Sequence, residues 1–179
     1  MKILPAIRSL KDFEKLIGSP YRSCVVLDIH IGHLDSHIRT IKSHGFEVYL
    51  HLDLIKGLAV DTASLEYIHQ KYKPTGIVTT RGRIVKKARQ LGMKTILRVF
   101  AIDSSAIEKS IELIDQCHPH LIEVLPGVVP KVIHLFKQEV AADVIAGGLI
   151  ETQSEVDDAI MAGASYVTTS KTSLWFDNI

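Results

Sequence analysis

The sequence predicts a closed α/β barrel, and three observations support that prediction. Eight short apolar runs, most of them rich in β-branched residues, recur along the 179 residues at nearly regular intervals. Within a run, apolar residues follow one another instead of alternating with polar ones, which is typical of parallel strands covered on both faces. Amphipathic helical patterns separate the runs, and eight alternating strand–helix units favour closure into a (β/α)8 barrel. An open, doubly wound sheet is the alternative.

The apolar runs give the expected positions of the strands. In chain order they are Ile3–Ile7, Cys24–Ile29, Val48–Leu52, Gly76–Thr80, Thr95–Ile102, Leu121–Leu125, Val144–Leu149 and Tyr166–Thr169. A (β/α)8 barrel typically has about 250 residues. We therefore expect a compact TIM-type barrel with short helices and few loops, in which residues 1–179 form one domain.

Helix positions follow from apolar stripes and from residues that favour helix ends. One stripe is formed by Ile107, Ile111 and Ile114, and another by Ile84, Val85, Ala88 and Leu91. Two pairs match a capping box, in which a hydroxyl residue precedes a glutamate by three positions: Ser105 with Glu108, and Thr152 with Glu155. Left-handed helix ends are expected at Gly18, Gly45, Gly92 and Gly163.

Composition limits the class of protein. The net charge is +1 and 23% of the residues are charged, so a chain that coats a polyanion is not indicated. Cys24 and Cys117 are too few for a disulfide framework and are expected to be reduced. Residues Met1–Ser9 lack the basic and apolar regions of a signal peptide, and no apolar stretch has the length of a membrane span. We expect a cytoplasmic protein without a membrane partner.

Ionisable residues occur in or directly after several apolar strands, where burial is costly unless a charge is paired. They are Asp28, His51, Asp53, Arg98 and Glu123. The carboxyl ends of barrel strands meet at one mouth, where function is usually located. We therefore take these five as candidate ligand-binding residues. An internal salt-bridge network that fills the barrel would explain them equally well.

The last two units contain a pattern typical of phosphate sites in barrels. Gly147 and Gly148 follow the seventh strand, while Thr169 and Ser170 end the eighth and precede Lys171. Glycines let backbone N–H groups approach an anion closely, and small hydroxyls add donors. These four residues are candidates for binding a small phosphorylated ligand. The simpler explanation is that the glycine pair only makes a turn. A lysine in the position of Lys171 is often only solvated.

Other kinds of site are not predicted. His33 and His37 lie four residues apart on an expected helix, but no third clustered ligand and no H-E-x-x-H pattern accompanies them. Nucleophile-elbow, Walker and dinucleotide-binding patterns are missing from the sequence. We therefore expect no metal, no cofactor and no catalytic residue of a conventional hydrolase, NTPase or dinucleotide-dependent enzyme.

A set of segments, taken together, resembles one family. They are Ile3–Arg8, Val26–His30, His51–Ile55, Gly76–Arg81, Ile122–Gly127, Ile145–Gly148, Thr169–Ser170 and Leu174–Trp175. Over almost its whole length the chain is similar to the glycerol uptake operon antiterminator regulatory proteins. The resemblance implies a barrel that senses glycerol 3-phosphate and acts on leader RNA to prevent premature termination of transcription. Residues Gly82–Arg83 and Ser170–Thr172 depart from the pattern expected for this family.

A run of cations is the candidate surface for the RNA that the resemblance implies. It consists of Arg81, Arg83, Lys86, Lys87 and Arg89, at the start of the fourth expected helix. With the apolar stripe turned inward, most of these cations would face outward, ready for phosphate contacts. A solvated helix face is the alternative. No RNA-binding motif or aromatic-rich stacking platform is recognisable, which predicts modest sequence readout or a homo-oligomer.

Three functions are compatible with the sequence. The resemblance favours a ligand-responsive RNA-binding regulator that is not an enzyme. Acidic and basic residues at barrel strand ends are also typical of isomerases, aldolases and epimerases, so a small phosphosugar-handling enzyme is the alternative. A former enzyme kept as a binding scaffold is a third possibility.

Overall fold

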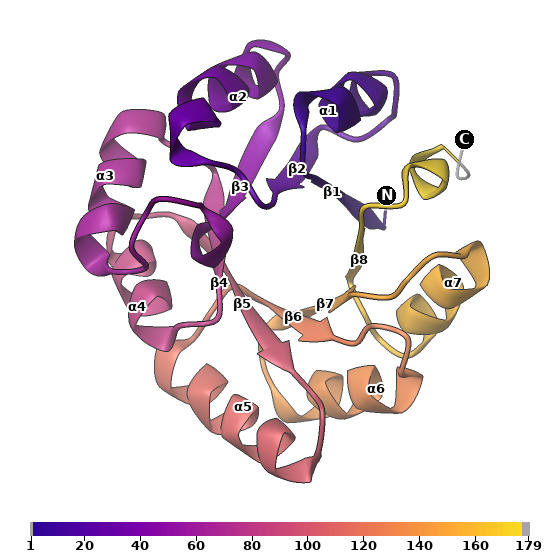
Figure 1. Cartoon of the computed structure of the whole chain (residues 1–179). Coiled ribbons are helices and arrows are strands. Elements are labelled where there is room, and N and C mark those ends of the chain that lie inside the picture. Colours follow the sequence, from indigo (N-terminus) through magenta and orange to yellow (C-terminus); the bar gives the residue numbers. More distant parts are fainter. Residues whose placement is uncertain (1, 177–179) are drawn as a thin grey trace.

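Eight parallel strands close into a barrel, and the helices lie around it (Figure 1). The structure is a computed structural model that describes residues 2–176. The strands are β1 (Ile3–Ile7), β2 (Ser23–Val26), β3 (Glu47–His51), β4 (Gly76–Thr79), β5 (Lys94–Phe100), β6 (Leu121–Leu125), β7 (Asp143–Gly147) and β8 (Tyr166–Thr169). Each strand pairs with its neighbours in sequence, and β8 pairs with β1. The predicted barrel is thus confirmed, and the open sheet is excluded.

Seven α-helices follow the first seven strands within the described part of the chain. They are α1 (Leu10–Ile17), α2 (Ile31–Ser43), α3 (Thr62–Tyr72), α4 (Gly82–Gln90), α5 (Ser104–Cys117), α6 (Pro130–Glu139) and α7 (Gln153–Met161). Two short 3-10 helices, η1 (Leu52–Leu54) and η2 (Thr172–Trp175), follow β3 and β8. The short turn η2 stands where an eighth helix is usual, and the buried Trp175 anchors it by donating from Nε1 to the Thr169 carbonyl at 3.2 Å.

Helix ends agree with the sequence at some positions and differ at others. Thr152 forms the predicted capping box with Glu155, but α5 starts one residue before Ser105 and is capped by Asp103, which accepts from Ala106 N at 2.8 Å. The Ser105 prediction was wrong because the aspartate two positions earlier is the better-placed acceptor. Left-handed glycines are found at Gly45, Gly92 and Gly163, with φ of +76°, +76° and +110°. Gly18 was predicted wrongly, since α1 ends in a right-handed turn with Gly18 at φ −76°.

Buried apolar residues form two clusters. The larger one fills the space between the strands and the helices. The smaller one comprises Leu4, Ala6, Val25, Leu27, Val78, Ile96 and Ile145. Because successive strand residues point to opposite faces, this second set lies inside the barrel and forms its interior packing. The strand residues above and below it reach the two mouths of the barrel.

Each mouth opens into a cavity. The cavity at the C-terminal ends of the strands has a volume of about 350 Å³, and the one at the N-terminal ends has about 800 Å³. The lumen is therefore accessible at these two mouths.

Among residues 2–176, no helix combines the length and the apolar character needed to cross a membrane.

Candidate functional site

The C-terminal mouth gathers side chains from most of the barrel. Its cavity is lined by residues of β1, β5, β6 and β8 and by residues that follow β1, β2, β3, β7 and β8. Arg8, Arg98, Glu123, Gly148, Ser170 and Lys171 are among them. Of these, Arg98, Glu123, Gly148 and Ser170 are candidates from the sequence. The lining contains three cations, Arg8, Arg98 and Lys171, and two carboxylates, Glu123 and Glu151, so a small excess of positive charge favours an anion.

Arg98 and Glu123 form the most buried ion pair of the described residues. Arg98 Nε donates to Glu123 Oε2 at 2.6 Å, and the side chains are only 15% and 5% exposed. Thr168, which the sequence did not single out, donates from Oγ1 to the other oxygen, Oε1, at 2.5 Å. Each carboxylate oxygen thus has a donor, which satisfies a charge that would otherwise be costly to bury.

Asp53 is held apart from this pair. It lies in η1, where Oδ1 accepts from Thr79 Oγ1 at 2.6 Å and Oδ2 accepts from Thr80 N at 2.8 Å and Thr80 Oγ1 at 2.6 Å. Burial pushes the pKa of Asp53 up, but the hydrogen bonds from Thr79 and Thr80 outweigh it and hold the pKa below its ordinary value. The Asp53 carboxylate therefore links η1, which follows β3, to the C-terminal end of β4 and to the residue after it.

Asp28 pairs with Arg8 and not with Arg98. The Arg8 guanidinium donates to Asp28 Oδ2, and Arg8 lines the cavity. Asp28 has φ +52°, a left-handed conformation that Asp tolerates better than most residues. This contact could not be read from the sequence because the partners end different strands and lie 20 positions apart. Asp28 thus orients a cation that the sequence argument missed.

His51 is surrounded by the other charged candidates. It pairs in register with Val78 of the lumen cluster, so its side chain points into the barrel. Only 2% of it is exposed, and neither ring nitrogen has a hydrogen-bond partner within residues 2–176. Burial and the Arg98 charge lower its pKa to about 4, although the carboxylates of Asp53, Glu123 and Asp28 oppose that shift. The imidazole is therefore neutral at pH 7 and offers one donor and one acceptor.

The two glycines after β7 have different roles. A Cβ on Gly147 would lie 2.6 Å from Thr168 Oγ1 and 2.7 Å from Glu123 Oε1, so this glycine makes room for the buried carboxylate and hydroxyl. Gly148 lines the cavity and has φ +77°, and Leu149 follows with φ +65°. Two successive left-handed residues turn the chain sharply at the cavity rim. Gly148 is the member of the pair that exposes backbone to the cavity.

The last residue of β8 and the two residues after it also have different roles. Thr169 Oγ1 donates to the Ile150 carbonyl at 2.9 Å and accepts from Lys171 N at 3.1 Å, so its hydroxyl joins the loops after β7 and β8. Ser170 is exposed, and its side chain and that of Lys171 line the cavity without a hydrogen bond in the described part of the chain. Thr169 thus shapes the rim that carries Ser170 and Lys171.

The five cations of the basic run are spread along α4. Ile84, Val85 and Ala88 are buried beneath them, while Arg83, Lys86 and Arg89 are exposed. The other two cations are engaged: Arg81 donates from Nη1 to the Val60 carbonyl at 3.1 Å, and Lys87 pairs with Glu66 at 2.5 Å. The outward cations available for a phosphate backbone are therefore Arg83, Lys86 and Arg89.

His33 and His37 lie on α2 with their rings stacked, 6.1 Å apart between centroids. Within residues 2–176, no group of three or more His, Cys, Asp or Glu side chains is arranged to hold a metal ion. The histidine pair therefore gives the described structure no metal centre.

Similarity to known proteins covers nearly the whole chain. A family model for the glycerol-3-phosphate responsive antiterminator matches residues 3–175. The crystal structure of a glycerol uptake operon antiterminator regulatory protein from Listeria monocytogenes is 39% identical, with 98% of this chain and 95% of that chain covered and a TM-score of 0.95.

Two further relatives are more distant. The structure of a glycerol uptake operon antiterminator-related protein from Thermotoga maritima is 29% identical, with 98% of this chain and 99% of that chain covered and a TM-score of 0.85. The uncharacterized protein YgcP of Escherichia coli K12 is 28% identical over 174 residues, which are 96% of this chain and 91% of that protein. This chain belongs to the glycerol-3-phosphate responsive antiterminator family.

Proposed function

We propose that this chain binds glycerol 3-phosphate in the C-terminal mouth and, in response, binds leader RNA of glycerol-use genes in the cytoplasm as a transcription antiterminator. The observation that carries the proposal is the cavity of about 350 Å³, which has the cations Arg8 and Lys171 and the buried Arg98–Glu123 pair in its lining. Membership of the family supports this choice of ligand.

The phosphate is assigned to the rim. Arg8 and Lys171 supply positive charge, the Ser170 hydroxyl supplies a donor, and the backbone at Gly148 permits close approach because no side chain covers it. Arg8 is already turned to this position by Asp28. A dianionic phosphate among these groups replaces its hydration by charge-assisted hydrogen bonds, which are about twice as strong as neutral ones.

The glycerol moiety is assigned to the inner end of the cavity. Glu123 accepts hydrogen bonds and also lines the cavity, and the neutral His51 lies close enough to feel its charge. A buried imidazole without partners costs about 1–3 kcal/mol. His51 does not itself line the cavity, so a ligand hydroxyl that reaches past Glu123 to the imidazole would recover that cost, which gives a polyol an advantage over a simple phosphate.

The RNA is assigned to the outward face of α4. Arg83, Lys86 and Arg89 are exposed there, above a buried apolar stripe that fixes the helix to the barrel. Cations on a rigid helix contact phosphates without reading sequence. This part of the proposal concerns binding strength and its dependence on salt.

A thermal-shift titration tests the ligand. Glycerol 3-phosphate at a hundred times its dissociation constant should raise the free energy of unfolding by about 2.7 kcal/mol. Glycerol should give no shift, and inorganic phosphate should give a smaller shift than glycerol 3-phosphate. Equal shifts with phosphate and glycerol 3-phosphate would contradict the assignment of the glycerol end.

The same samples separate a sensor from an enzyme. A sensor returns glycerol 3-phosphate unchanged, and it also leaves triose and pentose phosphates unchanged when these are incubated with it and measured by mass spectrometry. Depletion of a triose or pentose phosphate would favour the alternative function, a small phosphosugar-handling isomerase, aldolase or epimerase.

A further inference from the structure

The N-terminal mouth of the barrel holds a larger cavity than the proposed ligand site. It has a volume of about 800 Å³ and is lined mainly by the first residues of the strands. Ligand pockets usually have about 300–1,000 Å³, whereas the interior of a (β/α)8 barrel is normally filled by packed side chains. Here the lumen cluster supplies that packing, and Leu4 and Ile96 of the cluster also line the cavity, which lies at the mouth and has the volume of a ligand pocket.

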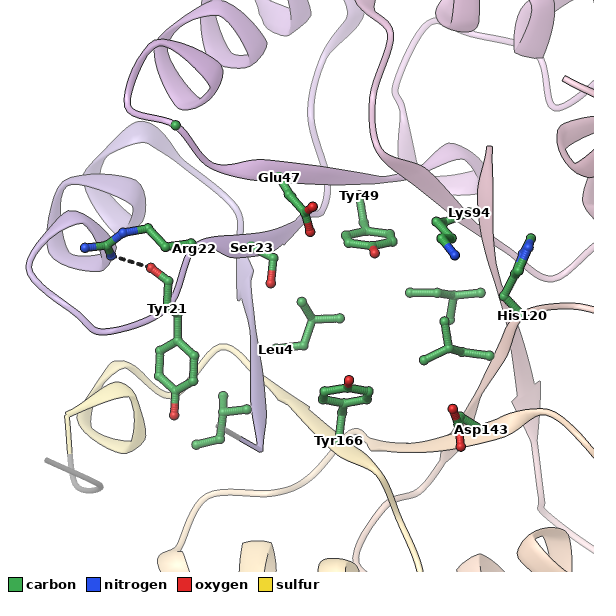
Figure 2. A pocket seen from close by; sticks show the side chains of 14 residues that line it. Leu4, Tyr21, Arg22, Ser23, Glu47, Tyr49, Lys94, His120, Asp143 and Tyr166 are labelled. Atoms are coloured by element: carbon green, nitrogen blue, oxygen red, sulfur yellow. Dashed lines mark hydrogen bonds between the residues drawn. The ribbon is translucent and has the colours of Figure 1, made fainter. Parts of the chain in front are cut away.

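Two tyrosines face each other across this opening. Figure 2 shows the rings of Tyr49 and Tyr166 nearly edge-on, on opposite sides, each turning a face toward the space between them, with Leu4 to one side of that space in the view. Tyr49 comes from β3 and Tyr166 from β8, where it is 40% exposed. A Cβ on Gly76, the register partner of Tyr49, would lie 2.9 Å from the Tyr49 ring. Because Gly76 has no side chain, the Tyr49 ring has room at this position in the mouth.

The polar side chains next to the two rings are available to a ligand. Glu47 and Lys94 flank Tyr49 in Figure 2, one on each side. Within residues 2–176, the side chains of Glu47, Tyr49, Lys94 and Tyr166 make no hydrogen bond or ion pair. Burial, and then the Glu47 carboxylate, raise the pKa of Tyr49, so its hydroxyl keeps its proton and remains a donor. The mouth therefore presents aromatic faces together with free donors and a free acceptor.

Cations connect this mouth to α4. His120 lines the cavity together with Lys94, and it also lines a neighbouring surface cavity together with Arg89, so it lies between the two cations. Burial, and then the charges of Arg89 and Lys94, lower its pKa. Thr95 N donates to His120 Nδ1 at 3.2 Å, which leaves the imidazole proton on Nε2. The exposed face of α4 thus continues through Arg89, His120 and Lys94 to the tyrosines.

We infer that the N-terminal mouth binds an unpaired nucleobase between Tyr49 and Tyr166, with Lys94 and Arg89 next to the sugar-phosphate chain. Aromatic side chains that stack on splayed bases are a common means of binding single-stranded RNA. An organic cation could use the free Glu47 carboxylate, but Lys94 lines the same opening with the opposite charge and Asp143 is already engaged by Ser165 and Lys137, so we favour a base, whose ring needs no net charge in the site. The inference rests on the proposed function only in naming leader RNA as the source of the base. A free nucleotide carries the same base and is expected to bind at the same place.

The test replaces the rings and measures binding to two kinds of probe. One probe is a single-stranded leader RNA oligonucleotide with 2-aminopurine at one unpaired position, measured with glycerol 3-phosphate present. The other is the set AMP, GMP, CMP and UMP. Tyr49→Leu and Tyr166→Leu should each weaken binding of the RNA between about 5-fold and about 150-fold and remove the quenching of the stacked base. Tyr49→Phe and Tyr166→Phe should bind nearly as the wild type, because the ring remains.

Tyr67→Leu is the matched control. Tyr67 is 41% exposed, like Tyr166, but lies on α3 outside the cavity, and its replacement should leave RNA affinity unchanged. Melting temperatures of all variants establish that they are folded. Leucine variants that bind as tightly as the wild type, or phenylalanine variants that lose as much as the leucine variants, would overturn the stacked-base site. Wild-type protein that binds nucleotides but no RNA would contradict the proposed function while supporting the site, and binding of neither would contradict both.

Discussion

Arg98 and Glu123 stand opposite each other in the register of β5 and β6, and their side chains meet inside the barrel at 2.6 Å. Strand pairing thus places the two charges together before any ligand is bound. The pair serves the fold, by satisfying a buried carboxylate, and it also forms part of the cavity wall. A structural and a ligand-binding explanation of these residues are therefore compatible.

Breaking this pair on one side should be costly. Arg98→Met leaves the Glu123 carboxylate buried with Thr168 as its remaining partner, and loss of one member of a buried pair typically costs about 3–5 kcal/mol. Urea unfolding followed by the fluorescence of the single tryptophan measures the loss. Adding Glu123→Leu should recover part of it, because both charges are then removed. A double variant as unstable as the sum of the single variants would contradict a direct interaction.

Stability should fall in mild acid because of His51. Its pKa is lowered to about 4 in the folded chain, whereas an unfolded histidine titrates near its ordinary value of 6.5. As the pH falls from about 6.5 to about 4, the unfolded chain takes up a proton that the folded chain cannot bind, so the free energy of unfolding decreases, by about 3 kcal/mol from this group. His51→Asn should lessen the slope of stability against pH over this range. An unchanged slope would show that other groups cause it.

Charge at Gly148 should matter more than size. Gly148→Asp and Gly148→Asn both place a side chain at φ +77°, where a Cβ would lie 3.3 Å from Leu125, and both should lose about 1–2 kcal/mol of stability. Only the aspartate adds a negative charge where the phosphate is assigned. The asparagine variant should keep most of the thermal shift with glycerol 3-phosphate, and the aspartate variant should lose it. Equal shifts in the two variants would place the phosphate elsewhere.

The strands were predictable because burial on both faces leaves continuous apolar runs, and the structure differs from the prediction mainly at strand ends. The second run was expected to extend to Ile29, but β2 ends at Val26 and is followed by the left-handed Asp28. Nothing in the sequence gives that backbone angle. The form of the segment after β8 was equally hidden, because within the described residues a short 3-10 turn with the buried Trp175 stands where the sequence pattern predicts a helix.

The charged residues at the strand ends were predictable from the sequence, but their partners were not. Charged residues at strand ends could be named, since burial of charge requires an explanation. Which cation meets which carboxylate depends on strand register and on turn geometry, so the pairing of Arg8 with Asp28 and the role of Thr168 emerged only in three dimensions. The same holds for Tyr49 and Tyr166, which are far apart in sequence and line one cavity because β3 and β8 belong to one closed barrel.

Charge reversal on α4 should weaken RNA binding. Lys86→Glu and Arg89→Glu remove two of the exposed cations, whereas Lys87 is occupied by Glu66 and is the less informative target. Affinity for leader RNA should fall, and the plot of log affinity against log salt should become less steep by about one unit per lost phosphate contact. Lys109→Glu on α5 serves as a control of equal charge change. An effect of the same size from Lys109→Glu would indicate general electrostatics instead of a defined surface.

Ligand and RNA binding should be thermodynamically coupled. The proposed phosphate cavity lies at one mouth of the barrel and the tyrosine cavity at the other, with the lumen cluster between them, so any coupling must pass through the barrel or along α4. If glycerol 3-phosphate tightens RNA binding tenfold, the coupling free energy is about 1.4 kcal/mol, and RNA must tighten glycerol 3-phosphate binding tenfold as well. Calorimetric titration of glycerol 3-phosphate with and without saturating leader RNA measures this from one side, and titration of RNA with and without the ligand measures it from the other. A ligand that has equal affinity for two states shifts neither population. Identical ligand affinities with and without RNA would therefore rule out a sensor mechanism, even for a protein that binds both partners well.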